Sequence, residues 1–191
     1  DFSMATPVFR EGELVAFTGI IAHASDVGGS IFSADNRSVF EEGLGVPPMK
    51  LFSEGVPNDE LFELVRYNVR VPEQVTGDFM AMVAGCEVAG RELLVFMDEY
   101  GVDLLETLSE NIQARAEAVM RRAIQKLPDG TYSHTVQLDG FDKPIDISCA
   151  ITIAGDELEV DFTGTSEQVD QGGVNVVYAY TWAFTTYPLK C

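Results

Sequence analysis

The chain alternates apolar and polar residues near its N-terminus and again after residue 130, whereas its middle part repeats apolar residues at helical spacing. Residues 2–9 and 14–23 are rich in Val, Ile, Phe and Thr, and a short Gly-containing turn separates them, which predicts a β-hairpin. Residues 24–57 contain many Gly and Pro residues and predict a long loop. Loops of this length are usually functional or interfacial, so we expect this loop to contribute to a site.

Three helices are predicted next. Asn58 is a favourable N-cap for the first helix, because its side chain can accept a hydrogen bond from a free backbone amide. Pro72 suits the first position of a second helix, whose apolar residues recur at helical spacing up to Gly101. Thr107 and Glu110 resemble a capping box, which predicts that a third helix begins there.

Strand-like alternation returns after the Pro-Asp-Gly turn at residues 128–130. Residues 132–138, 145–153 and 158–162 each alternate apolar and polar side chains, which predicts an antiparallel β-meander with one solvent-facing side. Residues 174–189 are mostly apolar and fit either a helix or a strand, and we favour a helix.

The predicted fold class is therefore α+β, with an antiparallel β-hairpin and a β-meander around a central group of long helices. Residues 1–57 form the hairpin and the site loop, residues 58–127 the helices, and residues 128–191 the meander and a C-terminal helix. A strand-like pattern is already present at residue 1, and the last residues are apolar and aromatic. We therefore expect residues 1–191 to be an interior segment of a larger domain.

The charge balance narrows the range of partners. Twelve Lys and Arg residues against 31 Asp and Glu residues give a formal net charge of −19. This charge repels phosphate backbones and anionic lipids, so we expect no nucleic acid and no membrane as partners. The three cysteines form no CxxC pair, which argues against a disulfide framework and makes a reducing cytoplasm the expected compartment.

The two histidines are the main candidates for chemistry. His134 alternates with apolar residues and is interpreted as a half-buried strand histidine, whereas His23 ends a strand just before a glycine-containing loop. A two-residue turn at positions 11–12 places Asp1 at the same end of the hairpin as His23, and a bulge would decide whether they share a face. A carboxylate and an imidazole held there could bind a divalent cation such as Zn or Mn, with further ligands from elsewhere.

A series of short motifs extends in order over the whole chain: Thr6-Pro7-Val8-Phe9, Ala22-His23, Asp26-Val27-Gly28-Gly29, residues 42–51, Asn68-Val69-Arg70, residues 127–132, residues 161–166 and residues 172–175. Through these motifs the chain resembles the hydantoinase B/oxoprolinase family. The resemblance implies a two-subunit system, in which a hydantoinase A-type subunit handles ATP where ATP is used. The B-type subunit then carries a metal site for cyclic amide opening or for carboxylation.

The resemblance also assigns roles to three residues. The family's metal motif is Gly-Gly-Thr-His-x-x-Asp followed by a later histidine; Asp1 matches its aspartate and His23 the later histidine, while the first histidine would precede residue 1. Asp26 is a candidate catalytic residue for proton transfer, a group that orients His23, or an ordinary loop aspartate.

The predicted function is the metal-binding catalytic B-type subunit of a hydantoinase or 5-oxoprolinase type hydrolase, with a small cyclic amide as substrate. The alternatives are a ketone carboxylase subunit of the same family and a non-catalytic assembly subunit with a degenerate site.

Overall fold

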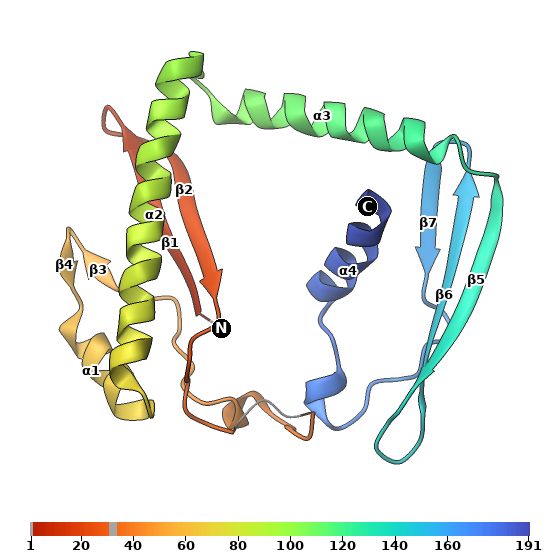
Figure 1. Ribbon diagram of the computed structural model, residues 1–191, viewed down its shortest axis with the longest axis horizontal. Coiled ribbons are helices and arrows are strands. Elements are labelled where there is room, and N and C mark those ends of the chain that lie inside the picture. Colours follow the sequence, from red (N-terminus) through yellow and green to blue (C-terminus); the bar gives the residue numbers. More distant parts are fainter. Residues whose placement is uncertain (1, 31–33) are drawn as a thin grey trace. The chain divides into compact units, whose positions relative to one another are not determined.

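A computed structural model describes residues 2–30 and 34–191 (Figure 1). The chain forms two units, Asp1–Glu106 with Gln171–Gly173 and Thr107–Asp170 with Val174–Cys191. Helices and separate antiparallel sheets occur together, which confirms the predicted α+β class.

An antiparallel hairpin opens the first unit. Strands β1 (Phe2–Arg10) and β2 (Glu13–Ala22) are joined by Glu11 and Gly12, whose φ angles of 53° and 88° are both left-handed. Two left-handed residues match the twist of the flanking strands, which explains why a two-residue connection suffices. The predicted hairpin is confirmed.

A β-bulge changes the register of this hairpin between Val8 and Phe9. On the turn side Phe9 pairs with Leu14, so that the partners' numbers add up to 23, as the turn position predicts. Beyond the bulge Phe2 pairs with Ala22, and the partners' numbers add up to 24. The register that the turn predicts therefore holds only near the turn. The register shifted by the bulge holds at the open end.

The three predicted helices are present as α1 (Asp59–Asn68), α2 (Pro72–Tyr100) and α3 (Leu105–Ile124). The side chain of Asn58 caps α1 as predicted, and α2 ends at the left-handed Gly101 with φ 62°. Helix α3 begins slightly before the predicted capping box. Within the described part of the chain, none of the helices combines the length and the apolar content that a bilayer crossing requires.

Helix α2 packs closely on the hairpin because two of its glycines face the strands. A Cβ atom on Gly85 would lie 2.6 Å from Cδ1 of Ile20, and one on Gly90 would lie 3.1 Å from a valine methyl carbon of β1. Between the two glycines Cys86 is fully buried, and the Thr18 hydroxyl donates a hydrogen bond to its carbonyl oxygen (3.0 Å).

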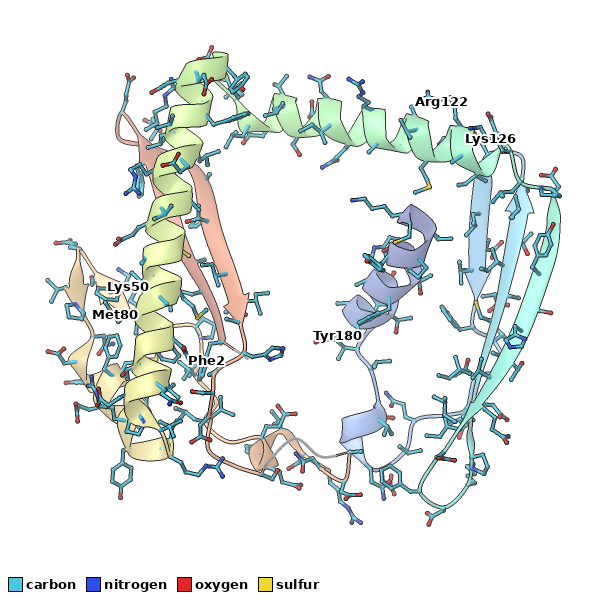
Figure 2. The ribbon with its side chains drawn as sticks, in the orientation of Figure 1. Phe2, Lys50, Met80, Arg122, Lys126 and Tyr180 are labelled. Carbon is cyan, nitrogen blue, oxygen red and sulfur yellow. The ribbon has the colours of Figure 1, made fainter. Side chains whose placement is uncertain are left out.

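The core of the first unit lies where α1, α2 and the open end of the hairpin meet. Phe2 lies at the start of β1 (Figure 2). Its ring packs edge-on against that of Phe79, with ring centroids 4.7 Å apart. The buried residues of this core are Leu61, Phe62, Val65, Val69, Val75 and Phe79. Apolar residues of the long loop pack against them, among them Ala24, Leu44, Val46 and Leu51, so the loop is anchored to the core.

The long loop also contains short regular elements. A 3₁₀ turn spans Val39–Glu41, and a small hairpin pairs β3 (Phe52–Ser53) with β4 (Val56–Pro57). These elements are too short to give a periodic pattern, which explains why the sequence predicts only a loop there.

The second unit contains the predicted meander. Strands β5 (Gly130–Leu138), β6 (Ile145–Ala154) and β7 (Glu157–Asp161) pair antiparallel in that order. His134 lies in β5, whose residues are all exposed, so the predicted half-burial is wrong. The most buried strand of this sheet is β6.

The apolar C-terminal region is helical as favoured. A 3₁₀ turn at Gly172–Val174 precedes α4 (Tyr178–Lys190). Helix α4 has no buried residue in the described chain, although most of its residues are apolar or aromatic.

Candidate functional site

The candidate site lies at the open end of the first hairpin. His23 directly follows β2 and is exposed, whereas the next residue, Ala24, packs against the core of the first unit. The chain then turns through residues 25–30 toward the end of α1. The His23 side chain is thus exposed to solvent, while the next residue anchors the backbone to the core.

Asp26 accepts four hydrogen bonds in the described part of the chain. Its Oδ1 accepts hydrogen bonds from the Gly28 backbone N (3.0 Å) and from Nε (3.2 Å) and Nη2 (2.6 Å) of Arg70. Its Oδ2 accepts a further bond from the backbone N of Arg70. The Asp26 side chain is 7% exposed, so this carboxylate is enclosed by its partners.

These contacts determine the charge state of Asp26. The Arg70 side-chain and backbone hydrogen bonds, helped by the bond from Gly28, hold the pKa of the Asp26 carboxyl well below its usual range. The same carboxylate raises the pKa of Arg70. Asp26 is therefore ionised at neutral pH and is a weak proton acceptor there, so its contacts favour a role in holding the loop.

The loop backbone is also fixed by direct contact with other segments. The amide of Leu44 donates to the carbonyl of Val27 (2.7 Å), and the amide of Ser30 donates to the carbonyl of Glu41 (2.8 Å). Gly29 has a φ of 60°, and a Cβ atom there would lie 2.6 Å from the Glu41 carbonyl oxygen. Glycine is required at this position because the two backbone segments touch.

The predicted site residues differ in what the structure says of them. Asp1 lies outside the described residues, so its predicted metal role stays a prediction. His23 is accessible at the hairpin end, and Asp26 is enclosed by Arg70 and Gly28. The metal role of His23 and the catalytic role of Asp26 stay predictions. Within residues 2–30 and 34–191, no three His, Cys, Asp or Glu side chains form a group that could hold a metal ion.

Arg70 is the functional candidate that the sequence reasoning did not single out. It lies in the short connection between α1 and α2, far along the chain from Asp26. Its only sequence signal is its place in the Asn68-Val69-Arg70 motif, because an ion pair between distant residues has no periodic pattern.

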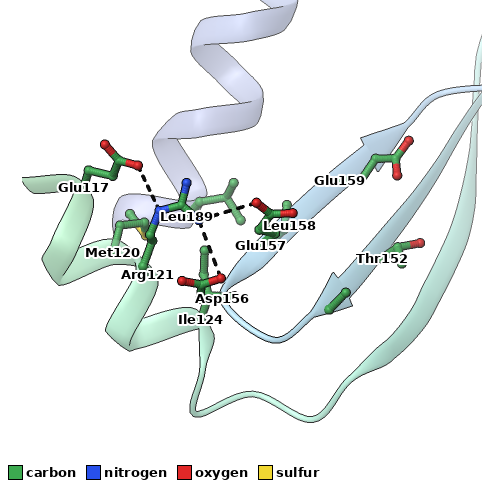
Figure 3. Close-up of a pocket in the computed structure, with 11 residues that line it drawn as sticks. Glu117, Met120, Arg121, Ile124, Thr152, Asp156, Glu157, Leu158, Glu159 and Leu189 are labelled. Carbon is green, nitrogen blue, oxygen red and sulfur yellow. Dashed lines mark hydrogen bonds and ion pairs between the residues drawn. The ribbon is translucent and has the colours of Figure 1, made fainter.

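A separate cavity lies within the second unit. It has a volume of about 510 Å³ and is lined by α3, the β6–β7 hairpin and Leu189 of α4 (Figure 3). Arg121 forms ion pairs there with Glu117 (2.8 Å), Asp156 (3.6 Å) and Glu157 (3.7 Å). These carboxylates raise the pKa of Arg121. Because Arg121 already has three acidic partners, we interpret the cluster as a structural contact that holds α3 against the sheet.

Comparison with known proteins gives matches along the whole chain. The family model for hydantoinase B/oxoprolinase matches residues 1–191. The putative D-/L-hydantoinase B-type subunit of Pseudomonas sp. (strain NS671) is 33% identical over 187 residues, covering 92% of this chain and 32% of that protein. The acetophenone carboxylase delta subunit of Aromatoleum aromaticum is 28% identical over 178 residues, covering 88% of this chain and 26% of that protein.

A solved structure has the same fold. The ATP-dependent caprolactamase from Pseudomonas jessenii matches with a TM-score of 0.76 and 32% identity, covering 88% of this chain and 30% of that chain. The chain spans a quarter to a third of the length of these three relatives.

Proposed function

The chain belongs to the hydantoinase B/oxoprolinase family, and from this premise we propose that its parent protein is the catalytic B-type subunit of a cyclic amide hydrolase. The observation that carries the proposal is the 33% identity to a putative hydantoinase B-type subunit over 92% of the chain. The likeness to the structure of a caprolactamase supports the same substrate class, because hydantoins and caprolactam are both cyclic amides.

The proposed cofactor is a divalent metal ion, Zn or Mn, with Asp1 and His23 as two of its ligands. The imidazole of His23 fits such an ion in its chemistry and its accessibility. Asp26 does not fit as a ligand, because three donors already occupy its Oδ1. Asp1 is proposed from its match to the aspartate of the family's metal motif.

The bound ion would supply the Lewis acidity that polarises an amide carbonyl or activates water. The chain itself positions His23. The pairing of β1 with β2 fixes the residues before it, and the Asp26–Arg70 ion pair fixes the loop after it. An ionised Asp26 would add negative charge near this site. Its proposed part in proton transfer requires that a substrate or a partner subunit displace one of its present donors.

We also propose a hydantoinase A-type subunit as the partner. The hydantoinase and acetophenone carboxylase relatives are both named as subunits, which implies that each works within a larger assembly. The caprolactamase of known structure is ATP-dependent, which supports ATP use through such a partner in this system. The expected compartment is the cytoplasm.

One alternative has its own support. The 28% identity to an acetophenone carboxylase subunit favours a ketone carboxylase as the second candidate. A non-catalytic assembly subunit is the third, and it would keep the fold without turnover.

A substrate panel separates these three functions. The full-length protein with its partner subunit is incubated with hydantoin, 5-oxoproline and caprolactam, with and without ATP and Mn²⁺ or Zn²⁺, and ring opening is followed by chromatography. A parallel series offers acetone and acetophenone with bicarbonate and ATP. We expect ring opening of at least one cyclic amide; ketone consumption alone would favour the carboxylase, and no turnover the assembly subunit.

A further inference from the structure

We propose that Arg70 is a positioning residue for His23, acting through Asp26 to fix the loop that follows the first hairpin. This inference rests on the proposed function, in which His23 is a metal ligand. It assigns to Arg70 no contact with the substrate or the metal, only control of where the imidazole lies.

The contacts make Arg70 the centre of the loop's attachment. It donates to Asp26 through its backbone N, Nε and Nη2, and Nη2 also donates to the Gly28 carbonyl oxygen (3.3 Å). One residue thus bonds both the side chain at position 26 and the backbone at position 28. The Asp26 side chain is 7% exposed while that of Arg70 is 61% exposed, so the carboxylate is the enclosed member of the pair.

His23 lies between two fixed points. On one side Ala22 is paired with Phe2 at the end of the β-ladder, and on the other the Asp26–Arg70 pair ties the loop to the α1–α2 connection. A Cβ atom on Gly28 would lie 2.7 Å from the carbonyl oxygen of Asn68, so the loop lies directly against the end of α1. Without the ion pair, the described contacts that remain on this side are the packing of Ala24 against the core and the backbone hydrogen bonds further along the loop.

The geometry requires arginine rather than any cation. A guanidinium presents its donors in a rigid planar fork, and here two of them reach the same carboxylate while one of these also reaches a carbonyl. A lysine at position 70 would keep the charge but lose the fork. Arg70→Lys should therefore only partly replace the native residue.

The expected effect is on metal affinity. Groups that hydrogen-bond to a metal ligand and orient it are typically worth about 10- to 100-fold in metal affinity when they are removed. Arg70 and Asp26 act on His23 through the loop backbone, so their effect should lie at the lower end of this range. We expect Arg70→Met and Asp26→Asn each to weaken binding within this range, and Arg70→Lys to weaken it less. Because Arg70 and Asp26 act through one contact, the double variant should bind the metal about as weakly as whichever single variant binds it less tightly.

The test uses the full-length protein in complex with its partner subunit, stripped of metal. Co²⁺ is titrated in and followed by visible absorption, which reports affinity and the ligand environment of the ion separately from turnover. The variants are Arg70→Met, Arg70→Lys, Asp26→Asn, the Asp26→Asn/Arg70→Met double variant and His23→Ala. Arg91→Met is the matched control, because Arg91 is exposed and pairs only with its neighbour Glu92 among the described ion pairs. Thermal unfolding is recorded for each variant.

Weaker Co²⁺ binding in both single variants, with native binding in Arg91→Met, supports the proposal. Native Co²⁺ affinity in the Arg70 variants alongside a lower melting temperature would overturn it, since Arg70 would then be merely structural; multiplied effects in the double variant would overturn it too. If Arg70→Met does not fold, Arg70→Lys and Asp26→Asn decide in the same way. His23→Ala separates the inference about Arg70 from the proposed function. Loss of Co²⁺ binding in His23→Ala with native binding in the Arg70 variants would overturn only the inference about Arg70. Native Co²⁺ binding in His23→Ala would overturn the proposed function.

Discussion

Phe2 and Ala22 are direct cross-strand partners at the open end of the first hairpin. Phe2 points into the core, where its ring contacts Phe79, and cross-strand partners project to the same face. Successive residues of a strand alternate faces, so His23 belongs to the outer face, which agrees with its exposure. The imidazole is accessible because the register beyond the bulge turns it away from the core.

The fit of the loop against its neighbour predicts a strong effect at Gly29. Gly29→Ala adds a Cβ atom 2.6 Å from the Glu41 carbonyl oxygen, at a φ of 60° that alanine rarely adopts. We expect a loss of more than about 1 kcal/mol in the free energy of unfolding, measured by urea denaturation. Amide exchange of Ser30 and Leu44, which bond across this contact, should accelerate.

Gly45→Ala is the control for this variant, since a Cβ atom there would meet open space. We expect it to change stability by about 0.5 kcal/mol or less. Equal effects at the two glycines would contradict the close backbone contact.

The Asp26–Arg70 pair predicts a pH dependence of stability. The folded protein holds the pKa of Asp26 below its ordinary value of 3.8, so the stability from this ionised group is fully present above about pH 5 and is lost as the pH falls below about 4. Compared with Asp26→Asn, the native chain should be more stable at pH 7, and this advantage should shrink as the pH falls. Thermal unfolding followed by circular dichroism between pH 3 and pH 7 measures it; a constant difference would refute the ionic role.

The core contacts predict different costs for two methionines on α2. Met97 is fully buried, so Met97→Ala should lower the free energy of unfolding by about 2–5 kcal/mol. Met80 is 48% exposed on the same helix, and Met80→Ala should cost much less. Urea denaturation of both variants checks this; similar costs would contradict the full burial of Met97.

Local patterns are enough to predict the longer helices and strands of this fold. The alternation in β1, β2 and the meander, the Asn58 cap and the Pro72 start of α2 are each encoded within a few residues. The bulge between Val8 and Phe9 could not be predicted, because apolar residues on either side of it suit both registers. The exposure of His134 was also missed, since burial of a strand depends on which elements cover it.

Local patterns single out only some residues of the candidate site. His23 is marked by its position between a strand and a glycine-containing loop, which is a local signal. The partner of Asp26 is Arg70, which lies beyond α1 in the chain, and nothing in the spacing of the two residues links them. The ion pair between Asp26 and Arg70 is therefore seen only in the folded structure, which brings these segments together.

We propose that His23 binds a metal ion, and metal analysis of the full-length protein purified with its partner subunit tests this most directly. Native protein, His23→Ala and the control His134→Ala, which changes an exposed histidine of the second unit, are compared by inductively coupled plasma mass spectrometry. The account predicts stoichiometric Zn or Mn in the native protein and in His134→Ala, and its loss in His23→Ala with an unchanged circular dichroism spectrum. Full metal content in His23→Ala would contradict it.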